Sequence, residues 1–157
     1  MRALAVLAAL VAAAFLPASL SAATPSPVVP PFIQKLIRAK AGALAYVPTR
    51  VPISYRYTGY GWKGGVLTIR VANRRFPLDG RHSLSFTARR FGGTLATCGD
   101  GRQKTLQMGG NKVYWNGELA WRCVRGRDGR LVRLAASGPN LPDVALGRVV
   151  ASGQRVA

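Results

Sequence analysis

The sequence predicts an α+β fold in which about seven short strands form an antiparallel sheet, with an N-terminal and a C-terminal helix packed on one face. Three observations lead to this fold class. Apolar residues recur with a helical period in 32–44 and again in 141–151, and between these segments hydrophobic and polar residues alternate with a period of two. Such alternation is typical of antiparallel strands with one buried and one solvated face.

The first predicted helix, 32–44, places apolar residues on one side and cations on the other. Pro31 stands just before it, where a helix tolerates proline best. A basic amphipathic helix can lie on a membrane, but we expect the apolar stripe to pack on the sheet. The stripe consists of Phe32, Ile33, Leu36, Ile37 and Leu44. A partner protein that recognises this stripe is an alternative, which would make the chain a structural or regulatory envelope protein.

After an extended bridge at 47–52, we expect strands at 53–58, 67–72, 84–89, 105–108, 112–115, 119–124 and 131–136. Turns are predicted at 59–65, at Asn116-Gly117 and at Asp128-Gly129. Asn140 is the candidate cap of the final helix, 141–151. The residues expected on the buried face of the sheet are Tyr55, Tyr57, Leu67, Ile69, Val71, Leu84, Phe86, Trp121 and Cys123.

The first 23 residues have the layout of a secretory signal peptide. Arg2 supplies a positive start, 3–16 carries no polar side chain, and 21–23 has small residues at the positions that signal peptidase reads. We therefore expect an exported protein, extracellular or in the cell envelope. An uncleaved N-terminal anchor is the alternative, because extension through Leu20 approaches the roughly 20 apolar residues that span a bilayer.

The sequence after residue 23 predicts one domain. Residues 24–31 are rich in proline and are expected to form an extended, solvated linker. The segment 32–157 has a length typical of a single domain with one core. We expect this domain to be monomeric.

Cys98 and Cys123 are the only cysteines, and an even number in an exported chain predicts a disulfide. In the chain-entropy account, closing a loop of about 26 residues stabilises the fold by roughly 3–4 kcal/mol. A catalytic or metal-binding thiol is the rival interpretation. Metal sites usually use closely spaced cysteine pairs with histidine partners, and this chain has one histidine, so no metal or other cofactor is expected.

The chain carries a formal net charge of +18, from 23 Lys and Arg residues against five Asp and Glu. Such an excess favours polyanions as partners: anionic lipid headgroups, acidic polymers of the envelope, or nucleic acid. Export argues against a specific nucleic-acid partner. The competing interpretation is a GC-rich coding sequence, whose codons favour arginine.

The same alternation that places apolar residues on the buried face of the sheet places arginines on its opposite face. The candidate binding residues are Arg56, Arg70, Arg89, Arg122 and Arg133, with Trp62 at an edge of the sheet. Either this face binds an anionic envelope component or a protein partner, or its arginines only keep the sheet solvated.

Catalytic signals are sparse. His82 with Glu118 or Asp100 would be the general acid–base set of a secreted phosphodiester hydrolase, a nuclease-like alternative. The chain contains no nucleophile elbow, zinc-protease motif, Walker loop or dinucleotide fingerprint. We therefore expect a non-catalytic binding domain.

Several short motifs carry a family resemblance: Tyr-Val-Pro-Thr-Arg-Val-Pro at 46–52, Val-Tyr-Trp at 113–115, Trp-Arg-Cys at 121–123, a Gly-Arg-Asp-Gly turn, and a terminal helix that closes on Ser152. Over 46–152 the chain resembles an uncharacterised bacterial family of extracytoplasmic domains. These domains often follow a membrane segment in regulators of envelope sigma factors. The resemblance implies a non-enzymatic extracytoplasmic domain and identifies no site residues.

Overall fold

The computed structural model describes residues 27–76, 80–99 and 101–157. The predicted signal peptide, its alternative as an anchor and the first part of the linker fall outside these ranges. Within them, no helix is both long and apolar enough to cross a bilayer.

Two α-helices and nine strands are described, together with three short 3-10 turns. In chain order they are α1 (Pro31–Ala41), η1 (Gly42–Leu44), β1 (Tyr46–Pro48), β2 (Tyr55–Lys63), β3 (Val66–Asn73), η2 (Gly80–His82), β4 (Ser83–Arg90), η3 (Ala96–Cys98), β5 (Lys104–Met108), β6 (Asn111–Trp115), β7 (Leu119–Arg125), β8 (Leu131–Ser137), α2 (Asp143–Ala151) and β9 (Gly153–Arg155).

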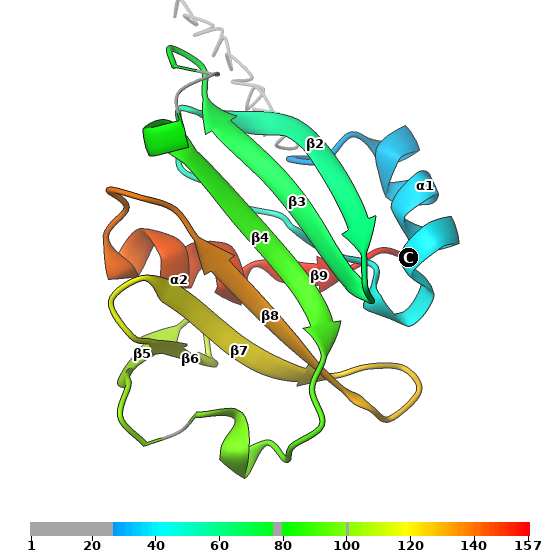
Figure 1. The fold of residues 1–157 in the computed structure, drawn as a ribbon, viewed down its shortest axis with the longest axis vertical. Coiled ribbons are helices and arrows are strands. Elements are labelled where there is room, and N and C mark those ends of the chain that lie inside the picture. The colour runs from blue at the N-terminus through cyan, green and yellow to red at the C-terminus, as the bar shows by residue number, and fades with distance from the viewer. Residues whose placement is uncertain (1–26, 77–79, 100) are drawn as a thin grey trace, which may run out of the picture.

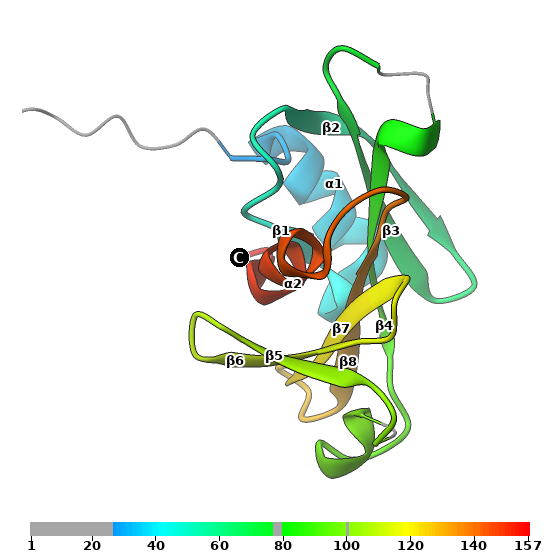
Figure 2. The ribbon, with the colours of Figure 1, turned by 90° about the vertical axis from the view of Figure 1, so that its left-hand side faces the viewer.

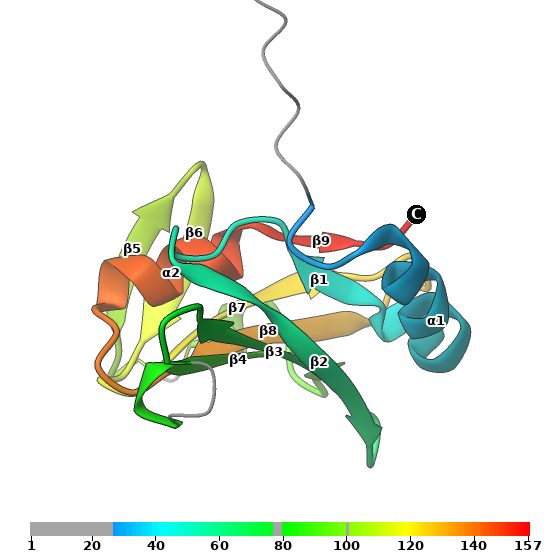
Figure 3. The ribbon, with the colours of Figure 1, turned by 90° about the horizontal axis from the view of Figure 1, so that it is seen from above.

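Seven strands form one antiparallel sheet in the order β2-β3-β4-β8-β7-β6-β5, and β1 and β9 pair in a second, two-stranded sheet. Figure 1 looks onto the large sheet, and Figure 2 shows that both helices lie on one side of it. The predicted α+β class and the placement of the helices are therefore confirmed. The β5–β6 hairpin bends away from the rest of the sheet and reaches alongside α2 (Figure 3).

The main core lies between the helices and the face of the sheet that they cover, here called the inner face. Register places Leu67 opposite Ala88 and Ile69 opposite Phe86, and the same face continues through Ala136 and Leu134 on β8. Their side chains are buried, as are Ile37 of α1 and Leu146, Val149 and Val150 of α2. Burial at roughly 25 cal/mol per Å² of apolar surface makes this layer the principal source of stability.

Helix α1 buries only part of its predicted stripe. Ile37 is buried and Ile33 packs against the core, whereas Phe32 and Leu36 remain 66% and 48% exposed. The preceding residues are not a fully solvated spacer, which corrects the linker expectation for its described part. Val29 is 1% exposed, and its carbonyl accepts a hydrogen bond from the Gln34 side chain at 2.8 Å.

Strand β7 has the predicted alternation in the opposite phase. Arg122 pairs with Leu134 and therefore shares the inner face, whereas Trp121 pairs with Ala135 on the other face. The expectation that Trp121 and Cys123 join the main core is wrong, and so is the expectation that Arg122 points away from it. Hydrophobicity suggested the wrong phase because the opposite face carries a core of its own.

This second core lies on the face of the sheet away from the helices, called the outer face. It buries Cys98, Tyr114, Trp121 and Ala135, with Phe91, Leu119 and Cys123 packed against them. The predicted disulfide is present: Cys98 and Cys123 are bonded, with their Cα atoms 6.0 Å apart. The Trp121 indole also donates a 2.7 Å hydrogen bond to the Cys98 carbonyl. Residue 98 is thus attached to β7 twice.

Two boundaries and one strand differ from expectation. The predicted turn at 59–65 is mostly strand, because β2 continues to Lys63 after a bulge between Tyr57 and Gly59. Helix α2 begins at Asp143 with Pro142 as its N-cap residue, while Asn140 adopts a left-handed turn with φ 62°. Strand β9 was not predicted; only its pairing with β1 defines it.

The disulfide makes a testable contribution to stability. Replacement of both Cys98 and Cys123 by alanine should lower the free energy of unfolding by about 3 kcal/mol, because the unfolded chain regains the freedom of the closed loop. Urea denaturation measures the change. The reduced wild-type protein should match the double variant, and a loss below about 1 kcal/mol would show that Trp121 and the second core hold residue 98 without the bond.

Candidate functional site

The outer face is covered over only part of its area. The second core occupies the side formed by β7 and β8, while the outer faces of β3 and β4 look toward the viewer in Figure 1 without a covering helix. Register puts Arg70 opposite Ser85 and Thr68 opposite Thr87 on this uncovered part. It is therefore a hydroxyl-bearing surface with exposed arginines.

A row of cations crosses this face from strand to strand. Lys63 pairs with Val66, Val66 with Arg89, and Arg89 with Arg133. Since neighbouring strands are about 4.8 Å apart, Lys63 and Arg89 are separated by roughly 10 Å at the backbone. The row ends on the second core, where the Arg133 guanidinium lies 4.6 Å from the centre of the Trp121 ring.

A hollow of about 470 Å³ brings two of the predicted binding residues together. Arg70 and Trp62 line it with Lys63, Val66 and Thr68. Gly61 forms part of its wall, and a Cβ atom added there would meet no atom within 4 Å. Two cations and a hydroxyl there can bind an anion. Register pairs Trp62 with Leu67 of the inner face, so its ring borders the hollow from the other side of β2.

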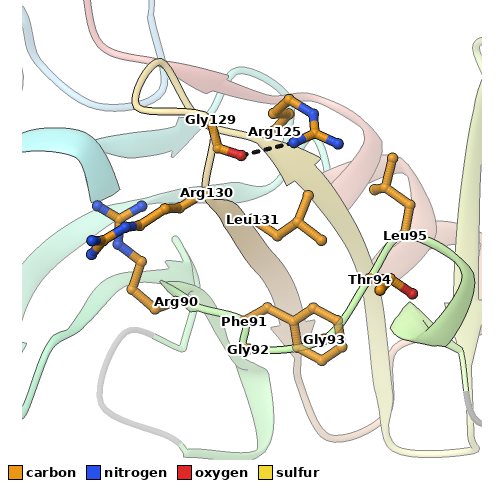
Figure 4. A pocket seen from close by; sticks show the side chains of 10 residues that line it. All are labelled: Arg90, Phe91, Gly92, Gly93, Thr94, Leu95, Arg125, Gly129, Arg130 and Leu131. Carbon is orange, nitrogen blue, oxygen red and sulfur yellow. Dashed lines mark hydrogen bonds between the residues drawn. The ribbon is translucent and has the colours of Figure 1, made fainter.

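A second hollow, of about 550 Å³, lies where β4 ends beside the β7–β8 hairpin. Figure 4 shows the side chains of Phe91, Leu95 and Leu131 around its interior, with the guanidinium groups of Arg90 and Arg130 together at one end. Arg125 lies on another side and donates a 2.9 Å hydrogen bond to the Gly129 carbonyl. The hollow thus combines an apolar floor with three cations at its rim.

One carboxylate stands among these cations. Asp128 pairs with Arg90 through both carboxylate oxygens, and it also accepts a hydrogen bond from the Arg130 backbone N–H at 3.2 Å. The hydrogen bond from Arg90 is the main cause that lowers the pKa of Asp128 below its ordinary value. The carboxylate therefore stays ionised at neutral pH and offsets one of the positive charges.

The two β-hairpins and the segment after β4 meet at one end of the sheet, because Val66 faces Arg89 and Arg125 faces Leu131 in register. This end, residues 61–66, 89–95 and 125–131, is called the hairpin end. Its exposed cations are Lys63, Arg89, Arg90, Arg125, Arg127 and Arg130. Asp128 is the one acidic residue in these three segments. Of the other described acids, Glu118 and Asp143 lie toward the opposite end.

Two predicted binding residues, Arg56 and Arg122, use their guanidinium groups in hydrogen bonds within the protein. The Arg56 guanidinium donates to the Ile53 and Tyr55 carbonyls, at 2.9 and 2.6 Å. Arg122 lies under the C-terminus of α2, where it donates to the Val150 carbonyl at 3.2 Å and to the Gly153 carbonyl at 2.9 Å. A third bond joins it to Asn111 Oδ1 on β6. Arg122 therefore closes a helix end rather than facing solvent, and burial lowers its pKa.

Among the described residues, the candidate acid–base residues of a hydrolase do not come together in one site. His82 stacks on Phe76, with ring centres 4.6 Å apart, and Glu118 belongs to the turn between β6 and β7. Asp100 falls outside the described residues. Across the described ranges, no three His, Cys, Asp or Glu side chains gather as a metal-binding group.

Arg90, Arg125 and Arg130 were not among the predicted site residues. The sequence did contain a signal, since arginines stand on both sides of the predicted turn at Asp128-Gly129. What it could not show is that this turn, the end of β4 and the β2–β3 hairpin meet at one edge, because strand order brings them together.

Comparison with family models, curated proteins and solved structures found no match to the chain. The resemblance to extracytoplasmic regulator domains therefore stays an expectation. The site has to be interpreted from its own chemistry.

The structural assignment of Arg122 predicts a loss of stability on substitution. Arg122→Met should lower the free energy of unfolding by about 2–3 kcal/mol, because the carbonyls of Val150 and Gly153 lose their donor in a partly buried place. Arg125→Gln, an exposed matched control, should change it by less than about 0.5 kcal/mol. Urea denaturation compares the two, and equal effects would contradict the assignment.

Asp128 should weaken anion binding at the hairpin end. Asp128→Asn keeps a residue suited to the turn and removes one negative charge, so affinity for a polyanion should rise about threefold at low salt, by Coulomb's law at roughly 7 Å in water. Because the pKa of Asp128 is lowered, the wild-type protein should show the same gain only as pH falls below the ordinary range of aspartate. Titration with heparin at several pH values tests both effects, and unchanged affinity of the variant at neutral pH would contradict them.

Proposed function

We propose that this chain is an exported, non-catalytic domain that binds an anionic component of the cell envelope through the uncovered outer face and the hairpin end. The observation that carries the proposal is the excess of exposed cations over carboxylates there. Six cations at the hairpin end, with Arg70 beside them on the outer face, stand against Asp128 alone among the described residues of these segments.

The surroundings of these cations support binding rather than only solubility. Lys63, Arg70 and Arg89 make no hydrogen bond or ion pair with any described residue, whereas Arg90 and Lys104 pair with Asp128 and Asp143. Cations without a carboxylate partner keep their full attraction for an external anion. Thr68, Ser85 and Thr87 between them supply hydroxyl donors.

Export is part of the proposal and rests on the predicted signal peptide. The Cys98–Cys123 disulfide supports it, since such bonds persist in oxidising compartments. For an exported protein with this excess of positive charge, the matching partner is an anionic polymer or lipid of the envelope.

The test compares two charge-matched double variants. Arg70→Gln with Arg89→Gln removes two cations from the outer face, and Arg50→Gln with Arg148→Gln removes two exposed cations near the C-terminus of α2, on the helix side. Titration with heparin at increasing salt should give a slope that is smaller by about two for the outer-face variant.

The helix-side variant should lose much less affinity, because it preserves the binding surface and changes only the distant charge. Equal losses in both variants would show that net charge alone governs the interaction. Absence of binding by the wild-type protein even at low salt would overturn the proposal.

A further inference from the structure

We infer that the anionic component is the surface of a lipid bilayer, and that the protein docks on it with its hairpin end, inserting Trp62 and Leu95 among the headgroups. This inference rests on the proposed function and narrows its partner to one class. It follows from the combination, at one end of the sheet, of cations with exposed apolar side chains.

The exposed apolar residues at the hairpin end are of a type suited to a membrane interface. Trp62 is 38% exposed on β2 just before the β2–β3 turn, and Leu95 is 50% exposed in the segment after β4. Tryptophan favours the headgroup level of a bilayer because its ring is amphipathic. A soluble polyanion would offer no apolar phase to either side chain.

The cations are arranged around these two residues. Lys63 is exposed and follows Trp62 directly at the tip of β2, and Arg90, Arg125 and Arg130 line the same hollow as Leu95. Each apolar side chain is therefore bordered by groups that can bind phosphates when it enters the interface. Basic residues next to inserted apolar groups are the combination by which peripheral proteins bind anionic membranes.

The geometry allows both hollows to reach one surface. The β2–β3 and β7–β8 hairpins project from the same end of the sheet, and their centres are three strand spacings apart, or about 14 Å. The helices lie on the inner face and leave this end uncovered (Figures 1 and 2). A flat bilayer can therefore contact both tips.

Sedimentation with vesicles tests the inference, using the oxidised full domain. The wild-type protein should bind vesicles of phosphatidylcholine with phosphatidylglycerol and should not bind phosphatidylcholine alone. Trp62→Ser with Leu95→Ser should weaken vesicle binding about tenfold and leave heparin binding unchanged. Arg125→Gln with Arg130→Gln should weaken vesicle binding about 20-fold and also weaken heparin binding.

Matched controls come from exposed apolar residues outside the hairpin end. Phe32→Ser with Ile53→Ser removes two exposed apolar side chains, 66% and 94% exposed, and should leave vesicle binding unchanged. Bromine-labelled lipids should quench tryptophan fluorescence of the wild-type protein. Trp62→Phe should abolish the quenching, because Trp121 is buried and Trp115 is partly buried toward the opposite end of the sheet. Urea denaturation of each variant confirms that the fold is retained.

The outcomes separate this inference from the proposed function. Heparin binding without vesicle binding would overturn the membrane partner and leave an anionic polymer as the ligand. Vesicle binding that is unaffected by the Trp62 and Leu95 substitutions, or lost equally in the Phe32 and Ile53 control, would overturn the docking surface. Failure to bind either probe would overturn both proposals together.

Discussion

A partly buried guanidinium organises this fold. Arg122 lies on the inner face of β7 and donates hydrogen bonds to the end of α2, to the first residue of β9 and to β6. Its charge meets carbonyl oxygens at a helix C-terminus, where the helix dipole favours a cation. One side chain thus joins the last helix, the smaller sheet and the β5–β6 side of the large sheet. A side chain at position 153 has no room beside this contact, since a Cβ atom there would come within 2.9 Å of Leu134 and 3.0 Å of Phe86.

The position of Arg122 on the inner face determines which residues of β7 lie on the outer face. Because side chains alternate along a strand, an inward Arg122 sends Trp121 and Cys123 outward. These large residues then need cover, and the segment that contains Phe91 and Cys98 supplies it. Many of the exposed cations lie on the rest of the outer face, which nothing covers, and at the hairpin end. The structural Arg122 and the arginines of the proposed binding surface are therefore parts of one arrangement.

Sequence reasoning succeeded where the signal was local. The period of 32–44, the alternation in β3 and β4, and the even number of cysteines predicted α1, the central strands and the disulfide correctly. The prediction was wrong about which residues of β7 face the main core. Hydrophobicity assigns Trp121 to that core, and no pattern in the sequence indicates that a second core exists. Strand β9 was missed because three polar or small residues form a strand only by pairing with β1. Of the predicted binding residues, Arg70, Arg89 and Trp62 lie on or beside the proposed surface; Arg90, Arg125 and Arg130 depend on strand order, which no local pattern encodes.

The segment between β4 and Cys98 forms one wall of the larger hollow and is held by the Cys98–Cys123 bond and the Trp121 indole. Before oxidation, a newly made chain would hold this wall by the indole hydrogen bond and apolar packing alone. The larger hollow of the proposed binding surface would then take its final shape only after the thiols are oxidised. Formation of the Cys98–Cys123 bond would thus be the step that fixes the shape of this hollow.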